Sequence, residues 1–528
     1  MEDEKEELEK RSNFIGENIL KWFKGKENFW IFFIIAVSLL IRIYYFSLTY
    51  DQPIWWDEAD YLNIAKSWLG TNNWDVNPLR PILFPLAICV LFLFGMGEII
   101  LRLLILLFSL AAIYYVYKVG ELLLSKRDGL LAATFLAIFW SFLFYTQRIL
   151  VDVPLAFLWL ITIYTFFKGY FKNYNWKYFI LPGFLLGLSF LLKFSSISLV
   201  AIFFIYLLIT EKSKLFGNKR VITFYLTSLL TVIPYFIWQK VKFGSFLAFY
   251  TSAINPAQKA ISRSFTQSLL DQIVFSTNVT HSILAILFVG GAILTLVSFL
   301  LLIDRSARKA TPYNKNMFLI LWLAISFIFF GWLNYGSYMD ERYYFILYPA
   351  MFLLAAKFTF YLYDNVKKAG KILAIILVAF LICFAAYQNL SHADAIIESK
   401  KTSFEQSKNI GEWLDKNSDV KRYQLLLGDS AAMVYYSDRN YINDPATNIT
   451  DVERSLQKYR PEYLAITLYS FNPSVQTPYS DLIYFIFSSR DIFLPVHMVA
   501  PNIPLNEQVA IPVGTIFKIN NSYFEEQE

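Results

Sequence analysis

Ionisable side chains stand at a few isolated places in a chain that is otherwise strongly apolar. The first to attract attention are Asp57, Glu58, Arg80, Asp152 and Lys193. Charge near a membrane is costly to hold, so such residues are functional candidates by default. Carboxylates can take up a proton during a reaction, and Arg and Lys can hold an anion. These residue types point to chemistry that needs a base and positive charge.

Each of these signals also has an ordinary structural explanation that the sequence leaves open. Asp57 and Asp152 stand where acids commonly cap helices. Lys193 could extend its side chain toward water from an apolar stretch. Arg342 follows two acids in YMDERYYF, where a charged cluster could anchor a helix at the membrane surface. What favours function is that all of them are predicted to lie on one side of the membrane.

The elements that must position these residues are membrane helices. The 528-residue chain is 56% hydrophobic and only 17% charged, with a mean hydropathy of +0.44, whereas soluble domains carry about 25% charged residues. We predict a polytopic α-helical membrane protein with about eleven transmembrane helices. The apolar stretches lie at residues 28–49, 98–118, 130–146, 153–168, 178–192, 196–210, 221–238, 282–303, 317–333, 343–361 and 372–390.

One further apolar run, residues 81–97, decides the topology because counting it as a span inverts every later loop. If it lies along the membrane surface or re-enters, five basic loops face the cytoplasm, as the positive-inside rule requires. These loops are residues 125–129, 168–177, 211–220, 304–309 and 364–371. We therefore predict that residues 50–97 and the tail lie outside the cytoplasm.

Three domains follow from this topology. Residues 1–27 form a cytoplasmic N-terminal segment, residues 28–390 form the transmembrane domain with residues 50–97 as its first outer loop, and residues 391–528 form an extracytoplasmic domain. The tail is polar and alternates helical patterns at about 403–416 and 450–459 with strand-like YQLLLGD, EYLAITLY and GTIFKIN. We expect a small α/β domain.

Composition excludes several classes of function. The net charge of +6 is small for this length and sits mostly in short loops, which argues against nucleic-acid binding. Cys89 and Cys383 both lie in apolar segments, so neither a disulfide framework nor a cysteine-based zinc site is expected. No cofactor is assigned, although two acids with few other ligands could hold Mg²⁺ or Mn²⁺.

The order of the charged motifs resembles the GT-C polyprenyl-phosphate-dependent glycosyltransferases, with the protein O-mannosyltransferases and lipid A aminoarabinose transferases as the nearest branches. Four segments within residues 28–350 carry the resemblance: DEADYLNIA (57–65), NPLRPILFP (77–85), ILVDVPLAF (149–157) and GLSFLLKFSS (187–196). The WWDYG motif of the oligosaccharyltransferase branch is absent from the tail. WWDE at residues 55–58 is in another place and only looks similar.

The resemblance implies catalytic roles for three acids. Asp57 would be the essential acid of the first outer loop, with Glu58 as its neighbour, and Asp152 would be the acid of the second loop. A base for the acceptor hydroxyl is one requirement of sugar transfer. We expect Asp57 to be that base and Asp152 to orient the acceptor or the sugar.

The resemblance also implies a cationic cradle for the donor phosphate. Arg80 stands where the aminoarabinose transferases have a lysine, and Lys193 stands where they have a Thr-Lys-Gly triplet, here with Leu192 and Phe194 as neighbours. Arg342 fits a weaker pattern of the family. Positive charge compensates the departing phosphate, and Arg suits two-point contact with it.

The function predicted from these features is transfer of a sugar from dolichyl- or undecaprenyl-phosphate to an extracytoplasmic protein, glycan or lipid. The alternative is a transporter or flippase for a lipid-linked or anionic substrate. Clustering of the charges at the outer face, and not at the membrane midplane, favours the enzyme. Because all proposed phosphate contacts precede residue 391, we also expect the donor site to be independent of the tail.

Overall fold

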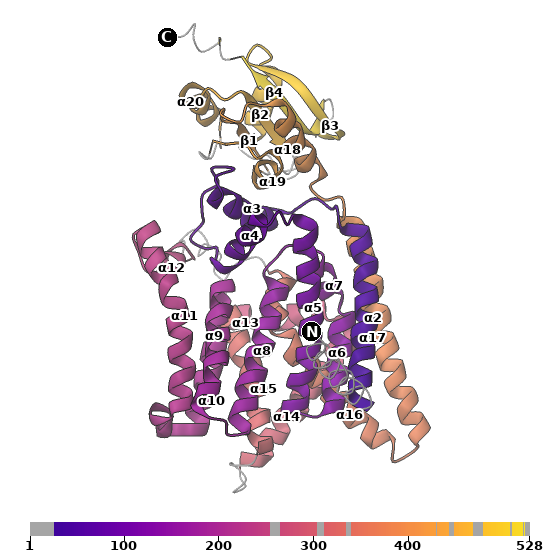
Figure 1. Ribbon diagram of the computed structural model, residues 1–528. Helices are drawn as coiled ribbons and strands as arrows, with labels where there is room; N and C mark the ends of the chain where they lie inside the picture. The colour runs from indigo at the N-terminus through magenta and orange to yellow at the C-terminus, as the bar shows by residue number, and fades with distance from the viewer. Residues whose placement is uncertain are drawn as a thin grey trace, which may run out of the picture. The chain divides into compact units, whose positions relative to one another are not determined.

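The chain folds into two units, each built from segments that are distant in sequence (Figure 1). The helical unit takes the chain up to Leu48 and Arg102–Ile397, and the α/β unit takes Thr49–Leu101 and Glu398–Glu528. The computed structural model describes residues 26–253, 264–303, 311–333, 339–428, 430–442, 448–467, 479–506, 509–520 and 522. The predicted N-terminal segment and the basic loop at 304–309 lie largely or wholly outside the described residues.

Long apolar helices dominate the helical unit. Within the described ranges, eight helical segments are long and apolar enough to cross a membrane. The chain is therefore a membrane protein. These segments contain α2 (Lys26–Thr49), α5 (Glu98–Leu123), α8 (Asp152–Phe171), α10 (Ile197–Glu211), α11 (Lys219–Phe243), α14 (His281–Ile303), α15 (Thr311–Leu333) and α17 (Lys371–Lys400).

The remaining predicted spans also fall on helices, but these are bent or short. The pair α6 (Lys126–Ile138) and α7 (Trp140–Thr146) bends by 59° and would make a ninth span if counted as one. The other helices are η1 (Trp176–Phe179), α9 (Ile180–Leu192), η2 (Phe194–Ser196), η3 (Lys212–Gly217), α12 (Ala248–Ala253), α13 (Phe265–Val279), η6 (Glu341–Ile346) and α16 (Tyr348–Val366). The number of about eleven spans stays a prediction.

Close backbone approach holds the helical unit together. A Cβ atom on Gly291 of α14 would collide with the backbone of Leu354 on α16, and one on Gly183 of α9 would collide with the carbonyl of Phe224 on α11. Small residues are enriched between membrane helices for this reason, because lipid gives no hydrophobic driving force for helix association. These glycines fix which helices are neighbours.

The α6–α7 pair runs antiparallel to α16 over its whole length. Phe139 packs edge-on against Tyr348, with ring centroids 4.6 Å apart. At one end Tyr145 Oη donates to Glu341 Oε1 over 3.0 Å, and at the other Arg127 pairs with Asp364. This pairing places the start of α16 and the end of α7 together, at the end of the unit where Asp152 begins α8.

The α/β unit is organised around a four-stranded sheet in the order β1-β2-β4-β3. β1 and β2 are parallel, whereas β2–β4 and β3–β4 are antiparallel. The small C-terminal α/β domain predicted from the tail is confirmed. Its elements are α18 (Glu405–Asn417), β1 (Leu425–Leu427), α19 (Ser430–Ser437), α20 (Ile449–Tyr459), β2 (Tyr463–Thr467), α21 (Tyr479–Ser488), β3 (Phe493–Asn506) and β4 (Val509–Ile519).

Two short helices of the first predicted outer loop, α3 (Trp56–Trp68) and α4 (Leu83–Leu93), belong to the α/β unit. α4 has 11 residues. At 1.5 Å per residue it is about 17 Å long, which is well short of the roughly 30 Å of hydrocarbon in a bilayer. This agrees with the prediction that residues 81–97 do not form a span.

The first predicted outer loop packs on the tail through polar contacts. Asn63 on α3 is buried and donates from Nδ2 to the carbonyl of Ala431 over 2.7 Å. Lys66 Nζ donates to the carbonyl of Tyr435 and pairs with Asp438, at 2.8 and 2.7 Å. The order and geometry of this loop therefore depend on the tail.

Candidate active site

Arg80 is held between two carboxylates in the α/β unit. Its Nη2 lies 2.5 Å from Asp57 Oδ1, and its Nε lies 2.5 Å from Asp60 Oδ2. α3 brings Asp57 and Asp60 to the same side because residues three apart lie on one helix face. Burial disfavours the guanidinium charge, but the nearby Tyr61, Asp57 and Asp60 outweigh it and raise the pKa of Arg80.

The two carboxylates differ in their access to other molecules. The side chain of Asp57 is 25% exposed, whereas that of Asp60 is 6% exposed. Asp60 is also fixed by the indole of Trp74, whose Nε1 donates to Asp60 Oδ1 over 2.8 Å. Asp57 is thus the carboxylate able to meet a substrate, and Asp60 holds the arginine in position.

Further aromatic contacts fix the arginine cluster. Arg80 Cζ lies 5.0 Å from the centroid of the Tyr61 ring. Trp74 stacks on Tyr441 of the tail, with ring centroids 5.0 Å apart and planes 27° apart. Asn73 exchanges two hydrogen bonds with the backbone of Tyr441. These contacts connect the first loop to the tail, because Trp74 lies between Tyr441 and Asp60. The expectation that the donor site is independent of the tail stays a prediction.

Glu58, the neighbouring acid, occupies a different environment. It is fully buried, and its Oε2 accepts from the backbone N–H of Trp55 over 2.9 Å. Such a bond satisfies an amide at the start of a helix that has no partner within the helix. The structure therefore gives Glu58 a part in fixing the entry into α3.

A second charged cluster lies in the helical unit, where Lys193 pairs with Asp152. The Lys193 Nζ to Asp152 Oδ1 distance is 2.5 Å, and the side chains are 23% and 3% exposed. Asp152 is the first residue of α8, where the helix dipole favours a carboxylate. Lys193 itself has an extended backbone conformation and separates α9 from η2. The break between the two apolar runs is what directs this lysine to Asp152.

Tyr343 connects this pair to the third predicted cation. Lys193 Nζ lies 4.6 Å from the Tyr343 ring centroid, and Arg342 Cζ lies 5.5 Å from the same centroid. Arg342 Nε in turn lies 2.9 Å from Asp340 Oδ2. Two cations therefore border one aromatic ring, and each has its own carboxylate. The sequence suggested Lys193 and Arg342 separately but not the ring between them.

Glu341 is a further acid of this cluster. Burial, and then the charge of Asp340, raise the pKa of Glu341 above its ordinary value. Tyr145 Oη donates to Glu341 Oε1 over 3.0 Å, and lies 3.3 Å from Asp340 Oδ1. A raised pKa makes a carboxyl group a candidate for proton transfer. Sequence analysis placed Glu341 in a charged cluster but gave it no catalytic role.

The six predicted site residues thus fall into two groups. Asp57, Glu58 and Arg80 gather in the α/β unit, whereas Asp152, Lys193 and Arg342 gather in the helical unit. Asp60, Trp74 and Tyr343 are contacts that sequence reasoning gave no role in the site. A carboxylate three residues after Asp57 was a signal for the first of these, but nothing in the sequence marks the two aromatic residues.

The described residues contain no group of three or more His, Cys, Asp and Glu side chains arranged to hold a metal ion. Pairs of carboxylates do occur, as at Asp57 and Asp60. A divalent ion there would displace or share these oxygens with Arg80, which already neutralises both. These residues therefore provide no ready-made metal site, and metal use stays open.

Comparison with known proteins identifies the fold. Residues 79–238 match the family model of dolichyl-phosphate-mannose-protein mannosyltransferase. ArnT from Cupriavidus metallidurans in the apo state aligns with a TM-score of 0.65 at 14% identity, over 93% of this chain and 98% of that one. The Archaeoglobus fulgidus oligosaccharyltransferase tethered to an acceptor peptide aligns with a TM-score of 0.59 at 15% identity, over 84% and 69% of the two chains. No curated protein sequence matches the chain.

These similar structures are GT-C glycosyltransferases, so the chain has the GT-C fold. The resemblance that the sequence motifs indicated is confirmed at this level. The family model starts at residue 79 and ends at residue 238. It therefore includes Arg80, Asp152 and Lys193, whereas Asp57 lies before the matched segment and Arg342 after it.

Proposed function

We propose that this protein is a membrane glycosyltransferase that moves a sugar from a polyprenyl-phosphate donor to an acceptor outside the cytoplasm. The observation that carries the proposal is the GT-C fold with acids and cations already paired at the positions of the family motifs. A structure of the similar ArnT is bound to undecaprenyl phosphate, and one of the archaeal oligosaccharyltransferase AglB holds dolichol-phosphate and an inhibitory peptide. Those ligands support the donor class.

Asp57 serves as the general base in this proposal. It is the more exposed of the two carboxylates beside Arg80, and Asp60 keeps the arginine in place while Asp57 reacts. Glu58 contributes by fixing the start of α3 rather than by touching substrate. Within the described residues Arg80 Nη1 has no hydrogen-bond partner, so this nitrogen is available to a phosphate oxygen while Nε and Nη2 remain bound.

The family motifs also assign Lys193 and Arg342, in the helical unit, as contacts of the donor phosphate. Each is already oriented by a carboxylate, so little reorganisation is needed when the donor binds. An ammonium group has three N–H donors, and the contact with Asp152 uses one of them. Asp152 acts through Lys193 in this proposal, which replaces the sequence-based expectation that it orients the acceptor or the sugar.

A transfer assay tests the proposed function. Purified protein in lipid nanodiscs is incubated with radiolabelled dolichyl- and undecaprenyl-phosphate sugars and with candidate protein, glycan and lipid acceptors. We expect label to move to an acceptor from at least one phosphate-linked donor, and not from the same sugar as a free nucleotide derivative. A folded protein that neither binds nor consumes any lipid-phosphate sugar would exclude the proposal.

Cysteine labelling tests on which side of the membrane the proposed reaction takes place. In a background with Cys89 and Cys383 replaced by alanine, Thr450→Cys is expected to react in intact cells with a membrane-impermeant maleimide. Lys172→Cys is expected to react only after permeabilisation. Both positions are exposed, so accessibility within the fold does not limit either reaction. The reverse pattern would place the α/β unit in the cytoplasm and rule out an extracytoplasmic acceptor.

A further inference from the structure

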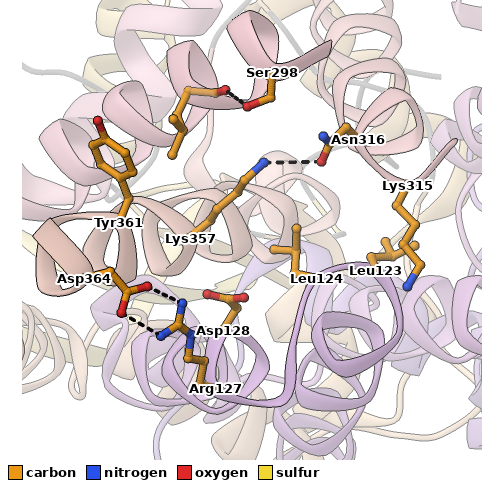
Figure 2. Close-up of a pocket in the computed structure, with 11 residues that line it drawn as sticks. Leu123, Leu124, Arg127, Asp128, Ser298, Lys315, Asn316, Lys357, Tyr361 and Asp364 are labelled. Atoms are coloured by element: carbon orange, nitrogen blue, oxygen red, sulfur yellow. Dashed lines mark hydrogen bonds and ion pairs between the residues drawn. The ribbon is translucent and has the colours of Figure 1, made fainter. Parts of the chain in front are cut away.

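A cavity of about 540 Å³ opens in the helical unit (Figure 2), and Asp152, Lys193 and Arg342 are not among its lining residues. It is bordered by the end of α5, the start of α6, α14, the start of α15 and the last turns of α16. Its polar lining residues are Arg127, Asp128, Ser298, Lys315, Asn316, Lys357, Tyr361 and Asp364. None of these residues takes part in the proposed transfer reaction.

The antiparallel pairing of α6–α7 with α16 fixes where this cavity lies. Arg127 and Asp364 border the cavity at one end of the pair, whereas Tyr145 and Glu341 meet at the other. Arg127 and Tyr145 are separated by 18 residues of mostly helical chain, or roughly 25 Å. This is close to the thickness of the hydrocarbon layer, about 30 Å. The cavity is therefore a second site at the opposite membrane boundary from the Asp152 cluster.

The charges that line the cavity are unevenly matched. Arg127 and Asp364 neutralise each other through two contacts, at 2.6 and 3.2 Å, and are about half exposed. Lys357 points into the cavity from α16 (Figure 2) and donates to Thr295 Oγ1 and Asn316 Oδ1, at 3.0 and 3.3 Å. Both of these acceptors are neutral.

Lys315 adds a second positive charge to the same cavity. Its Nζ lies 5.6 Å from the ring centroid of Phe171. Among the residues that the structure describes, neither Lys315 nor Lys357 has a carboxylate within 4.0 Å, the usual limit for an ion pair. The charge of Asp128 acts on Lys357, but the lining residues include three cations and two acids, and this excess of positive charge favours binding of an anion. Asp128, the remaining acid, accepts a hydrogen bond from the Ser125 hydroxyl.

The surroundings of the cavity favour a lipid as the source of that anion. Leu123, Leu124 and Leu294 form an apolar wall beside the cations. On α14, next to the lining residues Leu294 and Ser298, Ile293 and Val297 are 58% and 47% exposed. Exposed aliphatic side chains on a membrane helix contact acyl chains. A charged headgroup in the cavity would place its chains against this face.

We propose that this cavity binds the phosphate of an anionic membrane lipid, with Lys357 as the phosphate contact and Lys315 as a second positive charge of the lining. Lys357 points into the cavity from α16, whereas the Lys315 side chain runs from α15 toward the Phe171 ring, so Lys357 makes the direct contact and Lys315 adds positive charge at the edge of the cavity (Figure 2). Asn316, Ser298 and Asp128 are placed to bind hydroxyl groups of the headgroup, which favours headgroups such as glycerol over choline. Bound lipid would tie α14, α15 and α16 together at this membrane boundary.

The test uses the full-length protein and compares two sources of phosphate. Phosphatidylglycerol is titrated into protein in phosphatidylcholine nanodiscs, and glycerol 3-phosphate is titrated in a parallel series, with thermal unfolding and native mass spectrometry as readouts. A ligand of the native state raises its unfolding temperature in a saturable way. For phosphatidylglycerol we expect such a rise together with retained lipid in the mass spectrum.

Lys357→Met is expected to weaken this binding about ten- to a hundredfold, because a charge-assisted hydrogen bond is lost. Lys315→Met should weaken it less, and Lys357→Arg should retain most of it. Lys368→Met is the matched control, since Lys368 is exposed and its ammonium group bonds to the neutral Asn365. Equal response to glycerol 3-phosphate, lost in Lys357→Met, would support a phosphate site filled from solution. Absence of saturable binding from either source, or equal binding by Lys357→Met and Lys368→Met, would overturn the proposal.

Discussion

Replacing Asp57 with asparagine is expected to lower the turnover of sugar transfer by about 10²- to 10⁴-fold, the usual contribution of a general base. Asparagine keeps the size of the side chain and can still bond to Arg80, but it cannot accept the proton of the acceptor. Asp60 continues to hold Arg80 through Nε. Affinity for the lipid donor should therefore change little, so the loss belongs to kcat.

The control for this experiment is Asp51→Asn in the same segment. Asp51 is 77% exposed and pairs with Lys408, so its replacement removes a carboxylate without touching the arginine cluster. A helix-terminal acid contributes only about 0.3–1 kcal/mol to stability. If Asp57 had only that role, Asp57→Asn would behave like Asp51→Asn and transfer would remain near normal. That result would leave the proposed mechanism without its base.

Much of the membrane architecture could be predicted from the sequence because it depends on local composition. An apolar stretch of sufficient length must form a helix in lipid, where every backbone polar group needs an internal partner. The secondary structure of the tail could also be predicted, since α20 carries Val452 and Leu456 on one face and β2 is a continuous run of buried residues. The α20 pattern follows from the helical repeat, and the β2 pattern is that of a strand covered on both faces.

The number of spans was less predictable because several apolar runs are broken. The bend after Ile138 divides one run, and the extended residue Lys193 divides another. Hydropathy averages over such breaks and cannot tell a short helix from a tilted span. The charged residue that causes the second break is also the one that pairs with Asp152. The break in the helix therefore occurs at a residue of the candidate site.

Contacts between distant segments could not be predicted from one sequence. Asn63 bonds to the backbone of Ala431, and Trp74 stacks on Tyr441, across more than 360 positions in each pair. No local pattern specifies such a partner. The grouping of residues 50–97 with the tail was missed for this reason, and the expected independence of the donor site from the tail rested on sequence order alone.

Replacing Lys193 tests the role of the second charged cluster, because loss of its ammonium group should affect both the stability of the fold and donor binding. In Lys193→Met the buried carboxylate of Asp152 loses its partner, and an unpaired buried charge destabilises the fold by about 3 kcal/mol. Donor affinity should fall on the order of ten- to a hundredfold through loss of a charge-assisted contact. Thermal unfolding and donor titration measure the two effects separately.

The double variant Asp152→Asn/Lys193→Met separates the two effects. Asparagine removes the unpaired charge, so the double variant should recover most of the stability lost in Lys193→Met, which makes the two substitutions strongly non-additive. Donor affinity should not recover, because the ammonium group is still absent. Asp152→Asn alone should keep much of the donor affinity, since Lys193 also borders the Tyr343 ring. If restoring stability also restores donor binding, Lys193 is a structural partner of Asp152 and the phosphate contact must be assigned elsewhere.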